Sequence, residues 1–262
     1  MFKNLRLANN LKLDFLSGGY VKLDNRWIYR KRGFPFTRLY YIYSGSAVLS
    51  YNDTTVTMLP GNMYLLPANL PIAYHCPDQM VQLFLHVTLT TPEGFDMLSQ
   101  IPKVCQLPCS QSFLAQLKDL CNTEDYGQLL KLKTCVSQNL VDCLLAENIP
   151  FTIKHYSQIV LQAMTYMQSN ITIQLTGKQI AQAVCISPSL LYKRFKAETG
   201  ISLGAYQDKL VFYRATQLLA EQTLSLKEIS QQLGFCDQYY FSRRFKAQTG
   251  TTPSRYRKIH LA

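Results

Sequence analysis

Hydrophobic and polar positions follow different periods in the two halves of the chain. Residues 20–90 alternate in short β-branched and aromatic runs, broken by Gly, Pro, Asn and Asp, such as RLYYIYSGSAVLSYND, TTVTMLPGNMYLLPANLPIAYHC and MVQLFLHVTL. Short strands with frequent turn residues are typical of a small antiparallel barrel or sandwich. The alternation therefore predicts an N-terminal antiparallel β domain.

From residue 111 the apolar positions change to a helical period. One apolar stripe consists of Leu114, Leu117, Leu120 and Cys121, and a second of Leu132, Val136, Leu140, Cys143 and Leu144. Two such helices could cover the barrel or pair with a second subunit, and the sequence alone does not choose. The segment ENIPFTIKHYS (147–157) has a helix-breaking proline and is the predicted linker between domains at 1–150 and 155–262.

A ten-residue string occurs twice in the second half, as LYKRFKAETG (191–200) and FSRRFKAQTG (241–250), fifty positions apart. The similarity extends over 175–207 and 224–257, with one extra residue near Gly234 in the second copy. Each copy has cap signals for two helices, which are Thr176 and Ser187-Pro188 in the first and Ser225-x-x-Glu228 and Asp237 in the second. A short helix, a tight turn and a longer helix make a helix–turn–helix. We predict such units at about 173–200 and 224–250.

Helical spacing separates buried from exposed positions on the second helix of each copy. Leu191 and Phe195 in the first copy, and Phe241 and Phe245 in the second, would face the core. The outward positions are Ser189, Tyr192, Lys193 and Lys196 in the first copy, and Gln238, Tyr239, Ser242, Arg243 and Lys246 in the second. Amide, hydroxyl and cationic groups can bond base edges and phosphates. A polar face that meets only water is the alternative, which two stripes in matching frames disfavour.

The segment between the copies, 202–222, reads as one helix. About 18 helical residues span roughly 27 Å. Successive major-groove faces of a duplex are roughly 34 Å apart. A connecting helix of this length could place both units on one side of the same duplex.

Charge supports nucleic acid as the partner of the second half. The chain carries 27 Lys+Arg against 16 Asp+Glu, and residues 151–262 hold 14 of the former against 5 of the latter. Basic character concentrated in one domain is typical of a domain that binds a polyanion.

Residues 155–262 resemble the DNA-binding domain of the AraC/XylS family of bacterial transcription regulators. The resemblance rests on IAQAVCISPSLLYKRFKAETGISLGAY and ISQQLGFCDQYYFSRRFKAQTGTTPSRYR. It implies base-facing positions at Ser189, Tyr192 and Lys193, and at Gln238, Tyr239, Ser242 and Arg243. Tyr192 departs from the amide or basic residues often found there. The resemblance also implies promoter DNA and RNA polymerase as partners, activation of transcription, and a homodimer.

The N-terminal half is similar to the cupin-like sensory domain of sugar-responsive members of the family. That similarity implies a small-molecule effector, a sugar or sugar derivative. The candidate ligand-binding residues are Trp27, Arg30, Arg32, Tyr74, His75 and His86. An aromatic plane beside a guanidinium is a common way to hold a sugar or carboxylate. The resemblance places Arg30 near a ligand-binding arginine, and Tyr74, His75 and His86 would face the same cavity.

Three features limit the other function classes. Metal-dependent cupins need close histidines with a carboxylate, but His75 and His86 stand eleven apart, so we predict no metal, no cofactor and no enzyme. The chain has eight cysteines without a C-x-x-C pair and no signal peptide, which predicts a cytoplasmic protein. It also has no apolar run of about 20 residues, so we predict no membrane contact. Two alternatives stay open: a regulator controlled by a partner protein or thiol oxidation, and a cupin enzyme with an accessory DNA-binding module.

Overall fold

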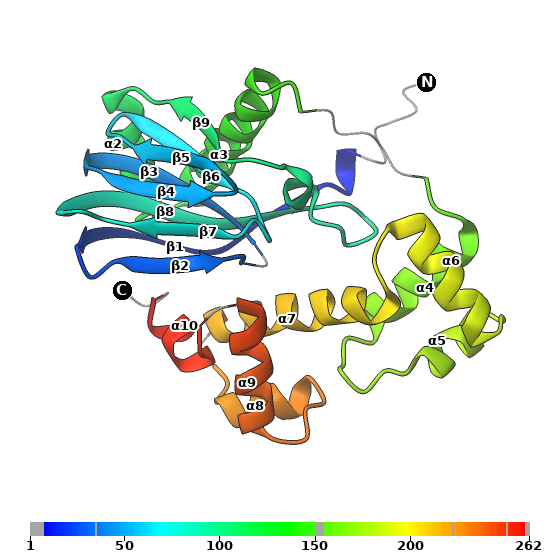
Figure 1. Ribbon diagram of the computed structural model, residues 1–262. Helices are drawn as coiled ribbons and strands as arrows, with labels where there is room; N and C mark the ends of the chain where they lie inside the picture. The colour runs from blue at the N-terminus through cyan, green and yellow to red at the C-terminus, as the bar shows by residue number, and fades with distance from the viewer. Residues whose placement is uncertain (1–7, 35, 150–154, 222, 250, 260–262) are drawn as a thin grey trace. The chain divides into compact units, whose positions relative to one another are not determined.

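The protein divides into two compact units. The computed structural model describes residues 8–34, 36–149, 155–221, 223–249 and 251–259, with the backbone alone at 29–32 and 259. One unit consists of residues up to 90 together with 96–149, and the other of 91–95 together with the residues from 155 onward (Figure 1). The chain thus enters the second unit twice, which the sequence analysis did not predict.

The first unit is built on two antiparallel sheets. A five-stranded sheet has the order β1-β8-β3-β6-β9 and a four-stranded sheet the order β2-β7-β4-β5 (Figure 1). The strands are β1 (Lys12–Asp24), β2 (Ile28–Arg32), β3 (Thr37–Gly45), β4 (Ala47–Tyr51), β5 (Thr54–Met58), β6 (Asn62–Leu66), β7 (Ile72–His75), β8 (Gln79–Thr90) and β9 (Cys105–Pro108). Every register pairing between them is antiparallel. This confirms the predicted β-rich N-terminal domain.

Strand β3, at the centre of the five-stranded sheet, is buried on both faces over most of its length. Leu39 and Tyr41 on β3 point to one face and pack against the 3-10 turn η1 (Met97–Gln100) and the helices α2 (Gln111–Leu120) and α3 (Tyr126–Ala146). The Nδ2 of Asn139 on α3 donates to the Tyr41 hydroxyl over 3.1 Å. Because side chains alternate along a strand, Arg38 and Tyr40 face the four-stranded sheet.

The two predicted helical stripes lie against this sheet. Leu114, Leu117, Val136, Leu140 and Cys143 all belong to the core that the helices share with the strands. The structure thus answers the question that the sequence left open, because these stripes cover the sheet. A different face of α3 carries exposed apolar side chains, at Tyr126, Leu130, Val141 and Leu145.

The second unit is helical and contains both predicted helix–turn–helix units. Its helices are α4 (Gln158–Ser169), α5 (Gly177–Ala183), α6 (Pro188–Thr199), α7 (Leu203–Glu221), α8 (Leu226–Gln232), α9 (Gln238–Thr249) and α10 (Pro253–Ile259). The pairs α5–α6 and α8–α9 are the two units, and α7 connects them (Figure 1). The predicted core positions Leu191, Phe195, Phe241 and Phe245 are all fully buried.

The predicted caps are present on the second unit's helices. Thr176 and Ser225 each form a capping box, with Gln179 and Glu228 as the respective partners. Ser187 caps α6 with Pro188 in its first turn, and Gly200 ends that helix in the left-handed conformation. The predicted helix break at Pro150 lies outside the described residues, as does Gly250, which is the repeat's counterpart of Gly200.

Residues 91–95 are part of the second unit through contacts with α4 and α7. The Tyr206 hydroxyl donates to the Glu93 carbonyl over 2.5 Å, and the Gln168 amide to the Pro92 carbonyl over 3.3 Å. The Phe95 ring lies 5.3 Å from the Tyr206 ring and stacks on Tyr156 at 5.6 Å. This segment therefore completes the core around α7.

Candidate functional site

Helix α6 presents a polar face to solvent. Leu191 and Phe195 are buried, whereas the predicted contact residues Ser189, Tyr192, Lys193 and Lys196 are exposed. The helical period places these four on one stripe because the intervening core residues face the other way. The stripe offers a hydroxyl, a phenol and two ammonium groups.

Tyr192 differs from the rest of this stripe because its phenol packs against the start of α5. A Cβ built on Gly177 would lie 2.0 Å from the Tyr192 hydroxyl, so the ring occupies the space that a larger residue would need. Tyr192 is still 49% exposed. The side chain therefore supports the junction of the two helices as well as facing outward.

Helix α9 presents the equivalent face in the second unit. Tyr239 is 77% exposed, Arg243 and Lys246 are exposed, and Gln238 and Ser242 are half-buried. The Arg243 guanidinium carbon lies 5.8 Å from the centre of the Tyr240 ring. Asp237 caps the helix by accepting the Tyr240 N–H over 2.6 Å, and this bond holds the pKa of its carboxyl below the usual range. The negative charge at this cap also suits the positive end of the helix dipole.

The cations on the two faces form no ion pair with a carboxylate of the described residues, although the charge of Arg243 contributes to the lowered pKa of Asp237. In the described part of the second unit, the ion pairs are formed by Arg214 with Glu221 and by Arg244 with Asp208. Lys193, Lys196, Arg243 and Lys246 are absent from them. A free, exposed ammonium or guanidinium is available to a phosphate or a guanine edge.

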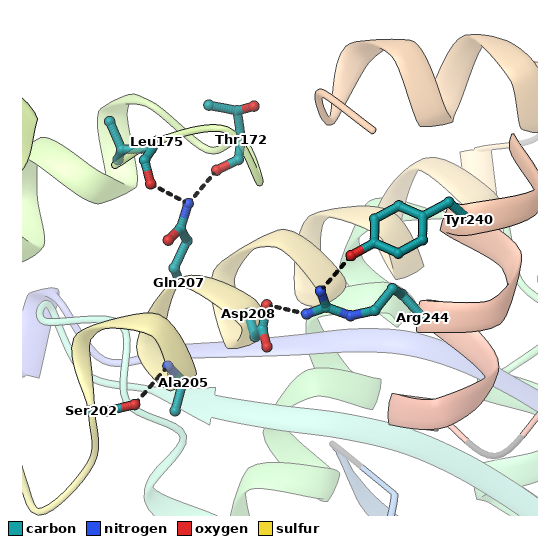
Figure 2. Close-up of polar contacts among 8 residues, drawn as sticks. All are labelled: Thr172, Leu175, Ser202, Ala205, Gln207, Asp208, Tyr240 and Arg244. Carbon is teal, nitrogen blue, oxygen red and sulfur yellow. Dashed lines mark hydrogen bonds and ion pairs between the residues drawn. The ribbon is translucent and has the colours of Figure 1, made fainter. Parts of the chain in front are cut away.

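Helix α7 holds both helix–turn–helix units through two consecutive residues (Figure 2). The Gln207 amide donates to the carbonyls of Thr172 and Leu175, just before α5, over 2.8 and 2.9 Å. Asp208 accepts from Arg244 on α9 over 2.7 Å, and Arg244 also donates to the Tyr240 hydroxyl over 3.2 Å. The units also touch directly, because the Ile173 N–H donates to the Leu233 carbonyl over 3.0 Å. These bonds fix the separation of the two exposed faces.

Sequence reasoning did not find these positioning residues. Arg244 aligns with Arg194 across the fifty-residue offset, which marks it as part of the repeat. Its partner Asp208 lies on the connecting helix, outside both copies, so no repeat pattern could reveal the pair.

The structure places the candidate ligand residues of the first unit on two different faces. The Trp27 ring lies 4.3 Å from Tyr74 and 6.2 Å from Tyr40, between the two sheets. His86 stacks on Phe36 at 4.6 Å, and its Nδ1 lies 2.8 Å from the Ser17 hydroxyl. His75, by contrast, is exposed on β7 while its neighbour Tyr74 is buried. The expectation that His75 shares a cavity with Tyr74 is wrong, because adjacent strand residues point to opposite faces.

The side chains of Arg30 and Arg32 lie outside the described part of the chain, so their predicted role stays a prediction. No cluster of three or more His, Cys, Asp or Glu suited to a metal ion occurs among the described residues. None of the helices in the described ranges is long and apolar enough to cross a membrane.

Comparison with known proteins decides the family. The profile of the AraC-like ligand binding domain matches residues 20–134, and that of a helix-turn-helix domain matches residues 180–259. The chain belongs to the AraC/XylS family of transcription regulators. Within this family it is a DNA-binding regulator with a ligand-binding domain, and not an enzyme.

Relatives of similar length are operon regulators. The chain is 25% identical to the Msm operon regulatory protein of Streptococcus mutans, over 95% of this chain and 94% of that protein. It is 24% identical to the lactose operon transcription activator of Staphylococcus xylosus, over 84% of this chain and 82% of that protein. Among solved structures, unsaturated fatty acid bound ToxT from Vibrio cholerae has the same fold, with a TM-score of 0.61 and 18% identity over 95% of each chain.

Proposed function

We propose that the protein is a cytoplasmic activator of transcription that responds to a sugar or sugar derivative. The observation that carries this proposal is the pair of exposed polar and cationic faces on α6 and α9, which α7 holds at one separation through Gln207 and Asp208. Each face would enter a major groove of one promoter duplex. Base contacts would come from Ser189, Tyr192, Lys193, Gln238, Tyr239, Ser242 and Arg243, and phosphate contacts from Lys196 and Lys246.

The sugar part of the proposal rests on the relatives and on the aromatic lining of the first unit. One regulator that matches most of this chain's length is named as a transcription activator of a lactose operon. Trp27, Tyr40 and Tyr74 supply ring faces on which a sugar could stack. Effector binding would then change how the protein acts on promoter-bound RNA polymerase.

A thermal-shift screen of the full chain against sugars, sugar acids and sugar phosphates tests the effector. A ligand at 100 times its dissociation constant adds about 2.7 kcal/mol to the free energy of unfolding, a shift of roughly 5 °C or more. The full chain is the right sample because residues 91–95 are part of the second unit. A cooperative melt that no compound shifts would contradict the sugar assignment and leave DNA binding untouched.

We also propose that the protein is a homodimer that pairs through the exposed face of α3. Leu130 and Leu145 are 67% and 70% exposed on the face that the sheet does not cover. Replacing Leu145 with glutamate should shift the protein from dimer to monomer in analytical ultracentrifugation, because the interface would then bury a carboxylate. The melting temperature of the monomer should change little, since Leu145 is 70% exposed in the single chain. A Leu145→Glu protein that stays dimeric would place the interface elsewhere.

Control by thiol oxidation finds little support in the structure. Burial raises the pKa of Cys105, Cys109 and Cys121 to about 11, and that of Cys143 to about 12. The thiolate is the reactive form, so these thiols react slowly at neutral pH. Cys185 and Cys236 are exposed and remain the residues to test in a redox assay.

A further inference from the structure

Arg38 is a buried cation between the two sheets of the first unit. It lies on β3 and is only 1% exposed. Its register partners are Leu66 on β6 and His86 on β8, so these three residues share the sheet face that looks toward β7. The guanidinium carbon lies 4.5 Å from the centre of the Phe34 ring and 6.0 Å from that of Tyr74.

The guanidinium of Arg38 has no hydrogen-bond acceptor. Its Nε, Nη1 and Nη2 atoms are all buried without a partner, and no carboxylate is paired with it among the described residues. Two acceptors on the same face of the sheet are also buried without a partner, the Gln82 Oε1 and the Thr88 Oγ1. Gln82 and Thr88 share this face because they lie four residues before and two residues after His86 on the register of β8.

An unpaired guanidinium at this depth is costly to the fold. Arginine stays protonated in proteins, so burial cannot neutralise it as it would a lysine. Two aromatic faces attract the cation but satisfy none of its five N–H donors. Natural proteins pair buried charges almost without exception. The arrangement is that of a binding site whose anion comes from outside the chain.

We propose that Arg38 binds the anionic group of the effector, a carboxylate or a phosphate, and that the effector is therefore a sugar acid or a sugar phosphate. This inference rests on the proposed function, since it names the chemical class of the molecule that the first unit senses. The flat guanidinium donates two parallel bonds to a carboxylate or phosphate. Hydroxyl groups of the same molecule donate to the Gln82 Oε1 and the Thr88 Oγ1, and its ring packs on Trp27 and Tyr74.

The Arg38→Met variant separates this role from a structural one. If Arg38 supported the fold, replacing it would lower the melting temperature of the protein. If Arg38 is instead a ligand-binding cation, its unpaired charge destabilises the ligand-free domain. The Arg38→Met substitution should then raise the melting temperature in sodium chloride by roughly 3–10 °C. An Arg38→Met protein that melts below the wild type, or without a cooperative transition, would overturn the proposal.

The second measurement is the response of the full chain to anions. The probes are acetate, inorganic phosphate, galacturonate and galactose 6-phosphate, with galactose as the neutral control, at constant ionic strength. Wild-type protein should gain stability from at least one anion, and Arg38→Met should bind that anion about 30-fold more weakly or worse. Carboxylates and phosphates that act differently identify which group the site takes. General salt effects cancel, because both proteins experience them.

The matched control is Arg26→Met, which removes an exposed arginine from the same unit. It should leave the anion response unchanged. Equal responses of wild type and Arg38→Met to all four anions would overturn the inference. The proposed function is tested separately, by measuring how both proteins bind a DNA duplex obtained by in vitro selection. If the selection yields no duplex, the proposal of a DNA-binding regulator is contradicted. If both proteins bind DNA but neither responds to anions, only the proposed role of Arg38 is contradicted.

Discussion

Replacing Arg243 with alanine should weaken binding to a selected duplex by about 5- to 150-fold, or about 1–3 kcal/mol, and relax the preference at one base pair. The guanidinium is exposed on α9 and pairs with no carboxylate of the described residues, so its donors are free for guanine. A contact with the face of the Tyr240 ring uses none of the guanidinium N–H donors for a hydrogen bond. Fluorescence anisotropy on a set of single-base variants of the duplex measures both effects.

Two other substitutions calibrate this result. Lys246→Ala should weaken binding uniformly across sequences and reduce the salt slope by about 1, as expected for a phosphate contact. Lys131→Ala removes an exposed cation from α3 in the other unit and should leave DNA affinity unchanged. If Arg243→Ala behaves like Lys246→Ala, Arg243 contacts the backbone. If it behaves like Lys131→Ala, Arg243 does not contact DNA.

Gly234→Ala should lower the free energy of unfolding of the second unit by about 2–3 kcal/mol and its melting temperature by roughly 10 °C. Gly234 has a φ of +77°, and an added Cβ would lie 2.1 Å from the Thr172 hydroxyl oxygen. Relief of that clash would disturb the contact between Thr172 and the Leu233 carbonyl. DNA affinity should therefore fall together with stability, because this contact joins the two helix–turn–helix units.

The first copy of the repeat supplies the opposite control. Cys185 takes the place of Gly234 there and adopts a φ of +56°, which costs a residue with a side chain about 1–2 kcal/mol. Cys185→Gly should raise stability by about 0.5 kcal/mol, since the added freedom of the unfolded chain offsets part of the relief. Thermal denaturation of the two single variants measures whether each change raises or lowers the free energy of unfolding. A stabilising Gly234→Ala, or a Cys185→Gly change that destabilises by 1 kcal/mol or more, would contradict this account of the turns.

Local signals predicted the second unit well. Caps at Thr176, Ser187 and Ser225 depend on neighbours within three residues, and burial of Leu191 and Phe195 depends on the helical period alone. Both signals are complete within a short stretch of sequence. Alternation along a strand also predicts that His75 and Tyr74 point to opposite faces. The expectation that both face one cavity did not take this alternation into account.

Pairs between distant segments could not be predicted in the same way. The bond between Asp208 and Arg244 depends on how α7 packs on α9. The contact of Tyr206 with Glu93 depends on a loop that lies far away in the sequence. Arg38 has a different difficulty. Its strand reads TRLYYIYSG and is buried on both faces, so alternation cannot mark one position as exposed. Only the folded unit shows that this arginine is buried and that its guanidinium has no hydrogen-bond partner.

The placement of residues 91–95 has a consequence for how the protein is made. Glu93 leaves the ribosome 113 residues before its partner Tyr206. At about 5–20 residues per second, this interval lasts roughly 6–23 s. During that time β8 can pair with β1 and β3, and β9 with β6, while Phe95 lacks the Tyr206 ring until the end of the interval. The nascent chain thus carries the Phe95 side chain without all of its packing partners until α7 emerges, and a chaperone that binds exposed aromatic side chains would have those seconds in which to bind it.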